Sequence, residues 1–373
     1  MSNKIIFNPD DMNGALYNIF FPVDMFENDA DKNEALEQLA FQLMPLETNM
    51  TDTSVFFLTE GRKILTAAMI TYYHQGMDFP QICKRIISSS WSTLFSEIDQ
   101  NGNYEAKQYI NSFEGTNEKN IAGCKQACDS ALKLFATNSH VYNAIGRERE
   151  GKEAFTPEQL ENKNIFVVIQ DSKLELYEPL VHIITAQCME YFSNRDNNNQ
   201  HTILMCLDEF ASFGHLEITP ALRKLRKKHV RIMVLTQSLA DIDLIYGRDE
   251  RMAMLNNFAY KIVLGCSDSD TQEYFSRLIG EKEVYRKAVS KNGKQVTNTR
   301  TEAKERIVPP AELARLGRHM ILLAEGKYYK LTKNYYFELD LWDRVKKCIN
   351  NLSRIQEEDF SEKNTLSLTD ENK

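Results

Sequence analysis

The stretch that decides the fold is Ile203-Leu204-Met205-Cys206-Leu207-Asp208-Glu209, five apolar residues followed by two carboxylates. An unbroken apolar run of this length predicts a strand of a parallel sheet that is covered on both faces. Ligands of such sheets bind just beyond the carboxyl ends of the strands. A carboxylate pair there suits nucleotide hydrolysis, because one acid can orient a magnesium shell and the other can polarise a water molecule. Acidic residues also commonly end strands and cap the next helix, so the pair alone leaves both interpretations open.

A second polar element follows the next apolar run. Thr236-Gln237-Ser238 comes directly after the predicted strand 232–235, about thirty residues beyond the carboxylate pair. A neutral amide at this edge can touch the terminal phosphate of a nucleotide and report its presence, although a polar loop residue would look the same. Two such elements on successive strands favour the core of a RecA-like motor.

Further apolar runs surround this core. Strands are predicted at 4–7, where Asn8-Pro9 ends the run, and at 165–169 and 260–264, with helices at 176–192 and 220–228. Strands that alternate with helices predict an α/β fold, a RecA-like P-loop NTPase-type parallel sheet. Asn292-Gly293 predicts a surface hairpin over 284–307, and a closing antiparallel pair is expected around Glu325-Gly326.

The periodicity divides the chain into four regions. Residues 1–53 form the N-terminal part of the motor domain, and residues 54–150, whose apolar positions repeat at helical spacing, form an inserted all-α domain. Residues 151–345 are the RecA-like motor domain. Residues 346–373 are expected to hold a helix end and a disordered acidic tail.

Composition limits the possible partners. The 373 residues carry a net charge of −8, which argues against a protein that coats duplex DNA, so any contact with nucleic acid must be local. No apolar stretch approaches the ~20 residues of a membrane span, and the seven scattered cysteines indicate a reducing compartment, which together predict a cytoplasmic polypeptide. One local basic run exists, Arg223 to Lys228, and it is either a solvated helix face or the source of an arginine that acts in catalysis.

Several stretches together resemble the TraG/TraD-type coupling proteins of type IV secretion and conjugation. The main ones are Leu207–Gly214 and Leu235–Ser238, with looser support from Phe155–Leu160, Tyr246–Arg248, Asn256-Asn257, Leu278–Gly280 and Pro309–Leu313. The similarity covers nearly the whole chain apart from the tail. It implies a P-loop ATPase that uses ATP and Mg²⁺ and works as a homo-hexamer at the cytoplasmic face of the membrane. Its implied partners are single-stranded DNA, relaxase and accessory proteins, and the proteins of the secretion channel.

The resemblance also implies roles for four residues. Asp208 would hold magnesium through water, Glu209 would activate the attacking water, and Gln237 would sense the terminal phosphate. Arg226, eleven residues before Gln237, resembles the arginine that such motors offer to the ATP site of the neighbouring subunit.

The sequence departs from that family in one respect. Family members begin with membrane helices and a phosphate-binding loop, and neither occurs here. Gly146–Lys152 has the spacing of such a loop, but Glu153 stands where magnesium needs Ser or Thr, so we interpret it as a charged linker. We therefore expect the 373 residues alone to be monomeric and without significant ATPase activity. Two alternatives stay open, a non-catalytic substrate-receptor or scaffold module and an FtsK-type DNA translocase, in which the helical insert would be unexpected.

The helical region carries one further expectation. The segment 99–120 is rich in Asn, Glu, Gly and Lys and poor in apolar residues. As an acidic, flexible surface it would suit a protein partner with basic patches better than DNA, whose phosphates it would repel. A solvated loop without a partner is the competing interpretation.

Overall fold

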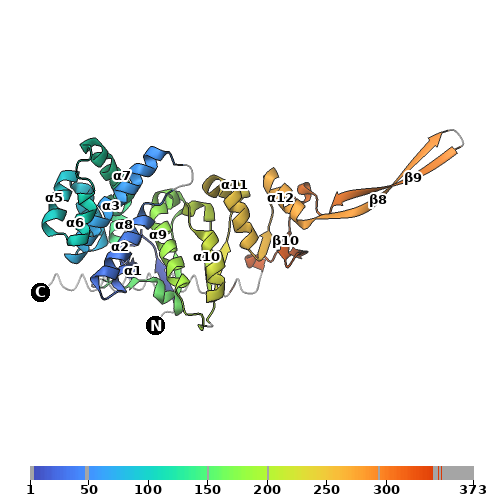
Figure 1. Ribbon diagram of the computed structural model, residues 1–373. Coiled ribbons are helices and arrows are strands. Elements are labelled where there is room, and N and C mark those ends of the chain that lie inside the picture. The colour runs from blue at the N-terminus through green and yellow to red at the C-terminus, as the bar shows by residue number, and fades with distance from the viewer. Residues whose placement is uncertain are drawn as a thin grey trace. The chain divides into compact units, whose positions relative to one another are not determined.

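The computed structural model describes residues 4–46, 50–148, 151–199, 201–292 and 295–338, together with Asp343 and Lys346. The chain divides into two compact units, Met1–Phe258 and Ala259–Lys373 (Figure 1). The helix end and acidic tail predicted over 346–373 lie outside the described residues except for Lys346. Within the described ranges, none of the helices combines the length and the hydropathy that a membrane span requires.

The first unit is organised by two neighbouring strands with a very long connection. Strand β1 (Lys4–Phe7) pairs in parallel with β4 (Asn164–Val167). Between them, β2 (Leu16–Tyr17) pairs with β3 (Ala154–Phe155) and also bridges to Ile145. The chain therefore enters and leaves the intervening region at one place, which is the topology of an inserted domain.

Between β2 and β3 every secondary-structure element of the described residues is a helix, which agrees with the helices predicted over 54–150, whereas α1 and α2 lie before that range, in the stretch that the sequence analysis assigned to the motor domain. Polar side chains act as N-caps, such as Thr51 at α3 and Asp78 in a full capping box at α4, which explains where these helices begin. The helices are α1 (Phe21–Asp24), α2 (Asp29–Leu43), α3 (Asp52–His74), α4 (Phe79–Ser88), α5 (Trp91–Asn101), α6 (Tyr104–Asn111), α7 (Glu118–Thr137) and α8 (Ser139–Ala144). The segment 99–120 contains α6, so part of the expected flexible surface is an ordered helix.

The motor part of the first unit contains a second parallel pair. Strand β5 (Ile203–Leu207) lies beside β6 (Val230–Val234), with Leu207 opposite Val234 at their carboxyl ends. The connecting and flanking helices are α9 (Leu174–Ser193), α10 (Ile218–Leu225) and α11 (Leu239–Asn257), with short 3₁₀ turns at Pro157–Glu161, Asp171–Lys173, Phe210–Phe213 and Arg226–Lys228. The α/β class and the strands predicted around the carboxylate pair are confirmed.

The expectation that these strands are covered on both faces is wrong. Leu204 of β5 is 61% exposed and Phe166 of β4 is 53% exposed, and Met233 of β6, on the same face as Leu204, is exposed as well. Both alternating positions of these runs are apolar, which predicts two covered faces, yet only Ile203 and Leu207 are buried in β5 and no residue of β4 is buried.

The second unit contains an antiparallel sheet of order β11-β10-β7. Strand β7 (Tyr260–Val263), expected as a fourth parallel strand, pairs antiparallel with β10 (His319–Ala324), which pairs in turn with β11 (Lys327–Thr332). Glu325 and Gly326 both have positive φ, as a two-residue hairpin turn requires. The remaining elements are α12 (Ser269–Ile279), β8 (Glu281–Asn292), β9 (Gln295–Arg306), α13 (Pro310–Leu313) and a 3₁₀ turn at Tyr336–Glu338.

Candidate functional site at the carboxyl ends of β5 and β6

The two polar elements singled out by the sequence meet in the structure. Glu209 follows β5, Gln237 follows β6, and the Nε2 group of Gln237 donates to Oε1 and Oε2 of Glu209 at 3.3 and 3.2 Å. Both side chains are exposed to solvent. A carboxylate beside an amide, both open to water at the edge where parallel strands end, is an arrangement that can orient a water molecule against a bound phosphate.

The backbone of Glu209 is held in an uncommon conformation. Its φ of 51° and ψ of 52° lie in the left-handed region, which costs a non-glycine residue about 1 kcal/mol or more. Hydrogen bonds on either side keep it there: Leu235 N donates to Leu207 O at 3.0 Å, and Phe210 N donates to Leu235 O at 2.9 Å. This twist turns the Glu209 side chain toward Gln237 while Phe210 enters the core.

A buried aromatic cluster supports the loop behind Glu209. The ring of Phe210 stacks on Tyr246 of α11 at 5.5 Å with an interplanar angle of 11°. The Tyr246 hydroxyl donates to Gly214 O at 3.3 Å and accepts from Leu216 N at 3.1 Å. Gly214 has a φ of 67° and a ψ of −162°, a conformation that glycine almost alone adopts, so the loop requires glycine at this position.

Asp208 has the surroundings expected of a magnesium ligand. Its side chain is exposed, and its Oδ1 accepts only the neighbouring backbone N–H of Glu209, at 3.2 Å, among the hydrogen bonds of the described residues. Nowhere in the described ranges do three or more His, Cys, Asp or Glu side chains gather as a metal site. Mg²⁺ usually takes one or two carboxylates, water and nucleotide phosphates rather than a full protein cage, so a single available carboxylate fits it.

The start of α11 fixes the position of Gln237. Ser238 is the N-cap of this helix, and its side chain and that of Asp241 form a reciprocal capping box. The Thr236 hydroxyl donates to Ser238 O at 3.0 Å. The amide therefore sits between the end of β6 and the N-terminus of a helix, where the helix dipole favours a negative group.

Arg226 does not belong to this cluster within one chain. It lies in the 3₁₀ turn before β6, at the amino end of that strand, whereas Gln237 follows the carboxyl end. Five strand residues separate the two ends by about 16 Å. The Arg226 side chain is exposed and makes no hydrogen bond or ion pair with another described residue.

A second polar cluster was not anticipated from the sequence. Asp10 lies three residues beyond the end of β1, and its Oδ1 accepts from Lys173 Nζ at 2.7 Å and from the Tyr177 hydroxyl at 2.9 Å. The hydrogen bond from Lys173 holds the pKa of Asp10 below its ordinary value. His140 Nδ1 lies 3.9 Å from the same oxygen. The position of an acid after a parallel strand was the signal that could have identified it.

The loop-like string Gly146–Lys152 has a structural role where it is described. The Arg147 guanidinium forms an ion pair with Asp24 at 2.7 Å and lies over the rings of Phe20 and Tyr73 at 5.3 and 5.1 Å. Arg149 and Glu150 lie outside the described residues. An arginine packed in this way ties the helical region together, which agrees with the interpretation as a linker.

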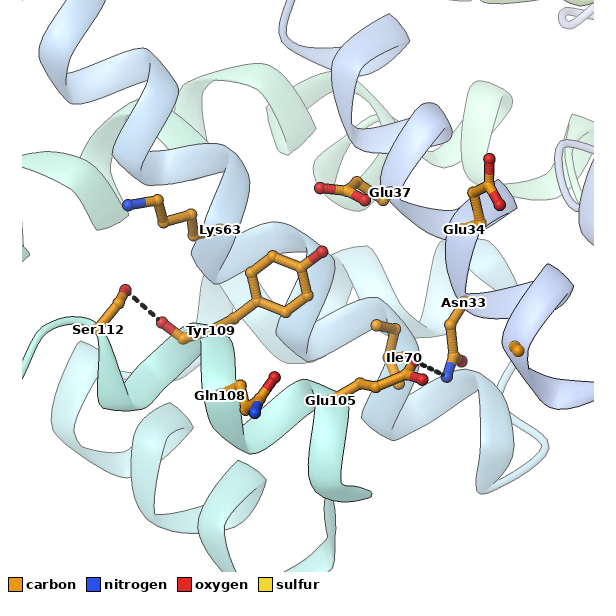
Figure 2. A pocket seen from close by; sticks show the side chains of 10 residues that line it. Asn33, Glu34, Glu37, Lys63, Ile70, Glu105, Gln108, Tyr109 and Ser112 are labelled. Atoms are coloured by element: carbon orange, nitrogen blue, oxygen red, sulfur yellow. Dashed lines mark hydrogen bonds between the residues drawn. The ribbon is translucent and has the colours of Figure 1, made fainter.

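The helical region has a pocket of about 660 Å³ among α2, α3 and α6. Figure 2 shows the side chains of Glu34 and Glu37 on α2 and of Glu105 on α6 among the residues that line this pocket. Burial and a hydrogen bond to Glu37 raise the pKa of Tyr109. Lys63 of α3 also lines this pocket but forms an ion pair with Glu60, so the wall is mainly acidic.

The sequence profile of the family "Type IV secretory system Conjugative DNA transfer" matches residues 2–363. The chain belongs to this family. It is 23% identical over 195 residues to the protein VirD4 of Agrobacterium fabrum and 24% identical over 195 residues to VirD4 of Rhizobium radiobacter. Each match takes in 50% of this chain and 28% of the relative, so the matched part is about a quarter of the curated relatives' length.

Solved structures of the plasmid coupling protein TrwB share the fold. The unbound monoclinic form of TrwBdeltaN70 gives a TM-score of 0.71 at 22% identity, covering 90% of this chain and 74% of that one. The TrwB complex with ADP and Mg²⁺ gives 0.67 at 20% identity, covering 91% and 76%. This likeness confirms a RecA-like NTPase fold with an inserted all-α domain.

Proposed function

We propose that this chain is the cytoplasmic motor portion of a type IV coupling ATPase that delivers a DNA–relaxase substrate to a secretion channel. The observation that carries the proposal is the hydrogen-bonded pair Glu209–Gln237 at the carboxyl ends of neighbouring parallel strands. Family membership and the TrwB complexes with nucleotides support the choice of ATP and Mg²⁺. The proposal also includes assembly as a homo-hexamer at the cytoplasmic face of the membrane.

Each residue of the edge has a distinct part in this proposal. The exposed Asp208 carboxylate holds the magnesium shell through water, and the Glu209 carboxylate accepts a proton from the attacking water. Gln237 senses whether the terminal phosphate is present. Because its amide contacts Glu209, it couples that presence to the carboxylate that acts as the base. Arg226, exposed at the opposite end of β6, serves the site of the neighbouring subunit, where it offsets developing negative charge.

Transfer assays in cells test the proposal. In the full-length protein, Glu209→Gln should abolish delivery of the DNA substrate while the protein still accumulates and still binds nucleotide. Glu175→Gln removes an equally exposed carboxylate from α9 and should leave transfer unchanged. Normal transfer with Glu209→Gln would contradict the motor proposal and favour a scaffold without catalysis.

A polypeptide of residues 1–373 should by itself hydrolyse ATP negligibly. Phosphoryl transfer depends almost wholly on positioning and charge neutralisation, and these residues include no strand followed by a phosphate-binding loop. Robust turnover that Glu209→Gln abolishes would contradict this expectation. We also expect this polypeptide to be monomeric, which sedimentation without nucleotide checks.

The acidic pocket among α2, α3 and α6 supports a substrate-receptor role for the helical domain. A relaxase or accessory protein with basic patches would dock there, and its affinity should fall as salt rises. Charge reversal by Glu34→Lys and Glu37→Lys should weaken binding of the cognate relaxase in calorimetry, whereas Glu114→Lys, exposed beyond α6, should not. Tight binding of bare single-stranded DNA by this surface would show the reverse preference.

A further inference from the structure

The first half of α11 contacts the candidate site at both of its ends. Just before its amino end, Gln237 donates to the Glu209 carboxylate. At its carboxyl end, the ring of Tyr246 stacks on Phe210, the residue that follows Glu209. The helix is interrupted immediately afterwards, because Gly247 has a φ of 72° and a ψ of 165°. The amide and the carboxylate are therefore joined a second time, through a short stretch of helix and the tyrosine at its end.

The Tyr246 hydroxyl bridges two backbone groups of the loop that begins at Glu209. It donates to Gly214 O at 3.3 Å and accepts from Leu216 N at 3.1 Å. Burial raises the pKa of Tyr246, which is only 3% exposed, so the hydroxyl stays protonated at neutral pH and remains both donor and acceptor. A buried backbone group without a partner is unfavourable, so these two bonds hold the loop against α11.

Further contacts fix the position of the tyrosine itself. The His215 ring lies 4.8 Å from the Tyr246 ring, and its Nε2 is 3.2 Å from Oε2 of Glu250 in the second half of α11. Asp243 in the first half forms an ion pair with Arg251 in the second half at 2.6 Å. The two halves of α11 are therefore tied to each other and to the loop, although the helix is interrupted between them.

The backbone of Glu209 depends on this support. Its φ of 51° and ψ of 52° are unfavourable for a residue other than glycine, so the surrounding contacts must hold it there. On the following side, Phe210 N donates to Leu235 O at 2.9 Å, and the Phe210 ring is held by Tyr246. The Glu209 side chain is exposed, so its direction is set by this backbone and by the hydrogen bond from Gln237.

We propose that Tyr246 is a positioning residue of the candidate site, whose ring and hydroxyl hold Glu209 and Gln237 in the relative position that activation of water requires. The part that concerns the reaction rests on the proposed function, whereas the fixing of the loop is a property of this chain by itself. The competing explanation is that Tyr246 is an ordinary core residue, whose loss lowers the stability of the whole first unit. The two explanations differ in what removal of the hydroxyl changes.

Amide hydrogen exchange on the 373-residue polypeptide separates a local effect from a global one. Tyr246→Phe keeps the stacked ring and removes only the hydroxyl. Tyr17→Phe is the matched control, because it removes the hydroxyl of another buried tyrosine, which donates to Gln187 at 2.6 Å. We expect the Phe210 amide, which is not itself bonded to Tyr246, to exchange at least about tenfold faster in Tyr246→Phe and as in the parent in the control.

ATP hydrolysis by the full-length protein tests the consequence for the reaction. A misplacement of about 1 Å can lower a rate by about 100-fold, so Tyr246→Phe should lower kcat by about tenfold or more while the KM for ATP changes by less than about twofold. The same change combined with Glu209→Gln should cause no further loss, because the carboxylate that Tyr246 positions is then absent. Tyr17→Phe should leave kcat unchanged.

Four results would overturn the inference: unchanged exchange at the Phe210 amide, an equal rise of exchange in both tyrosine variants, a normal kcat in Tyr246→Phe, or losses that multiply when Tyr246→Phe and Glu209→Gln are combined. If Tyr246→Phe has a normal kcat while Glu209→Gln abolishes hydrolysis, the inference fails and the proposed function stands. If hydrolysis survives Glu209→Gln, it is the proposed function that fails, and exchange at Phe210 then decides whether Tyr246 holds the loop.

Discussion

The helical region and the motor strands differ in how far their apolar side chains are buried. In α3, Ile64 and Leu65 are fully buried, and the aromatic rings of Phe79 and Phe135 meet at 5.4 Å in the same core. In β5, by contrast, Leu204 is 61% exposed although its neighbours along the strand are apolar. The core of the helical region is closed to solvent, whereas β5 and β6 expose Leu204 and Met233.

This difference assigns most of the folding stability to the helical core and the candidate site to the strands with the exposed face. Burial of large side chains is the main source of folding free energy, so the helical core should dominate the resistance of the first unit to denaturant. Exposed apolar faces of this kind usually mark surfaces that meet other polypeptide segments. The candidate site lies at the end of the strands with the open face, where Glu209 and Gln237 are themselves exposed.

The largest expected effect comes from two matched phenylalanine truncations. Phe135→Ala in the helical core should lower the free energy of unfolding by about 3–5 kcal/mol, because it leaves a cavity among closed helices. Phe166→Ala on β4, where the ring is half exposed, should cost about 1 kcal/mol or less. Urea denaturation followed by circular dichroism measures both. Equal losses of unfolding free energy in the two variants would contradict the difference in burial between the two regions.

A smaller effect is expected at the cluster around Asp10. Asp10→Asn should cost about 1.5–3 kcal/mol, the range for hydrogen bonds to a charged group, because Lys173 and Tyr177 both donate to its carboxylate. The folded-state pKa of Asp10 is lowered, so its contribution is present above the unfolded pKa of about 3.9 and is lost as pH falls through the folded value. The free energy of unfolding of the parent and of the Asp10→Asn variant, measured at pH 7 and at pH 3, checks this. The difference between them should shrink at the lower pH, and a constant difference would assign the effect to packing.

The smallest effect on stability is expected on the open face of the strands. Leu204→Gln with Met233→Gln should change the free energy of unfolding by less than about 0.5 kcal/mol, since both side chains are exposed. The same change should reduce binding of a hydrophobic dye and slow aggregation. A large loss of stability would show that this face is packed in solution, and the comparison drawn above would then have to be abandoned.

The sequence predicted the strands and the site edge because these depend on local patterns. The run Ile203–Leu207 with its two acids, and Gln237 after the next strand, identify a parallel pair and its ligand edge without knowledge of distant contacts. A hairpin over 284–307 was likewise predicted from its turn residues, and β8 and β9 lie at 281–292 and 295–306, although the turn itself at 293–294 lies outside the described residues.

What the sequence did not predict depends on partners far along the chain. The pairing of β7 with β10 instead of a parallel neighbour is decided by residues about sixty positions away, which periodicity does not register. Asp10 gains its surroundings from Lys173 and Tyr177, more than 160 residues later. The exposed face of β5 could not be predicted, because a strand with only one covered face can still be apolar at every position.

The most direct test of the central claim, that Glu209 and Gln237 act together on the attacking water, is a double-mutant cycle on ATP hydrolysis by the full-length protein. We predict that Glu209→Gln lowers kcat by at least about 100-fold, that Gln237→Ala lowers it by about tenfold or more, and that the double variant is no slower than Glu209→Gln alone. Such non-additivity is expected of two groups that form one unit. Losses that multiply in the double variant, or a kcat that survives Glu209→Gln, would contradict the account.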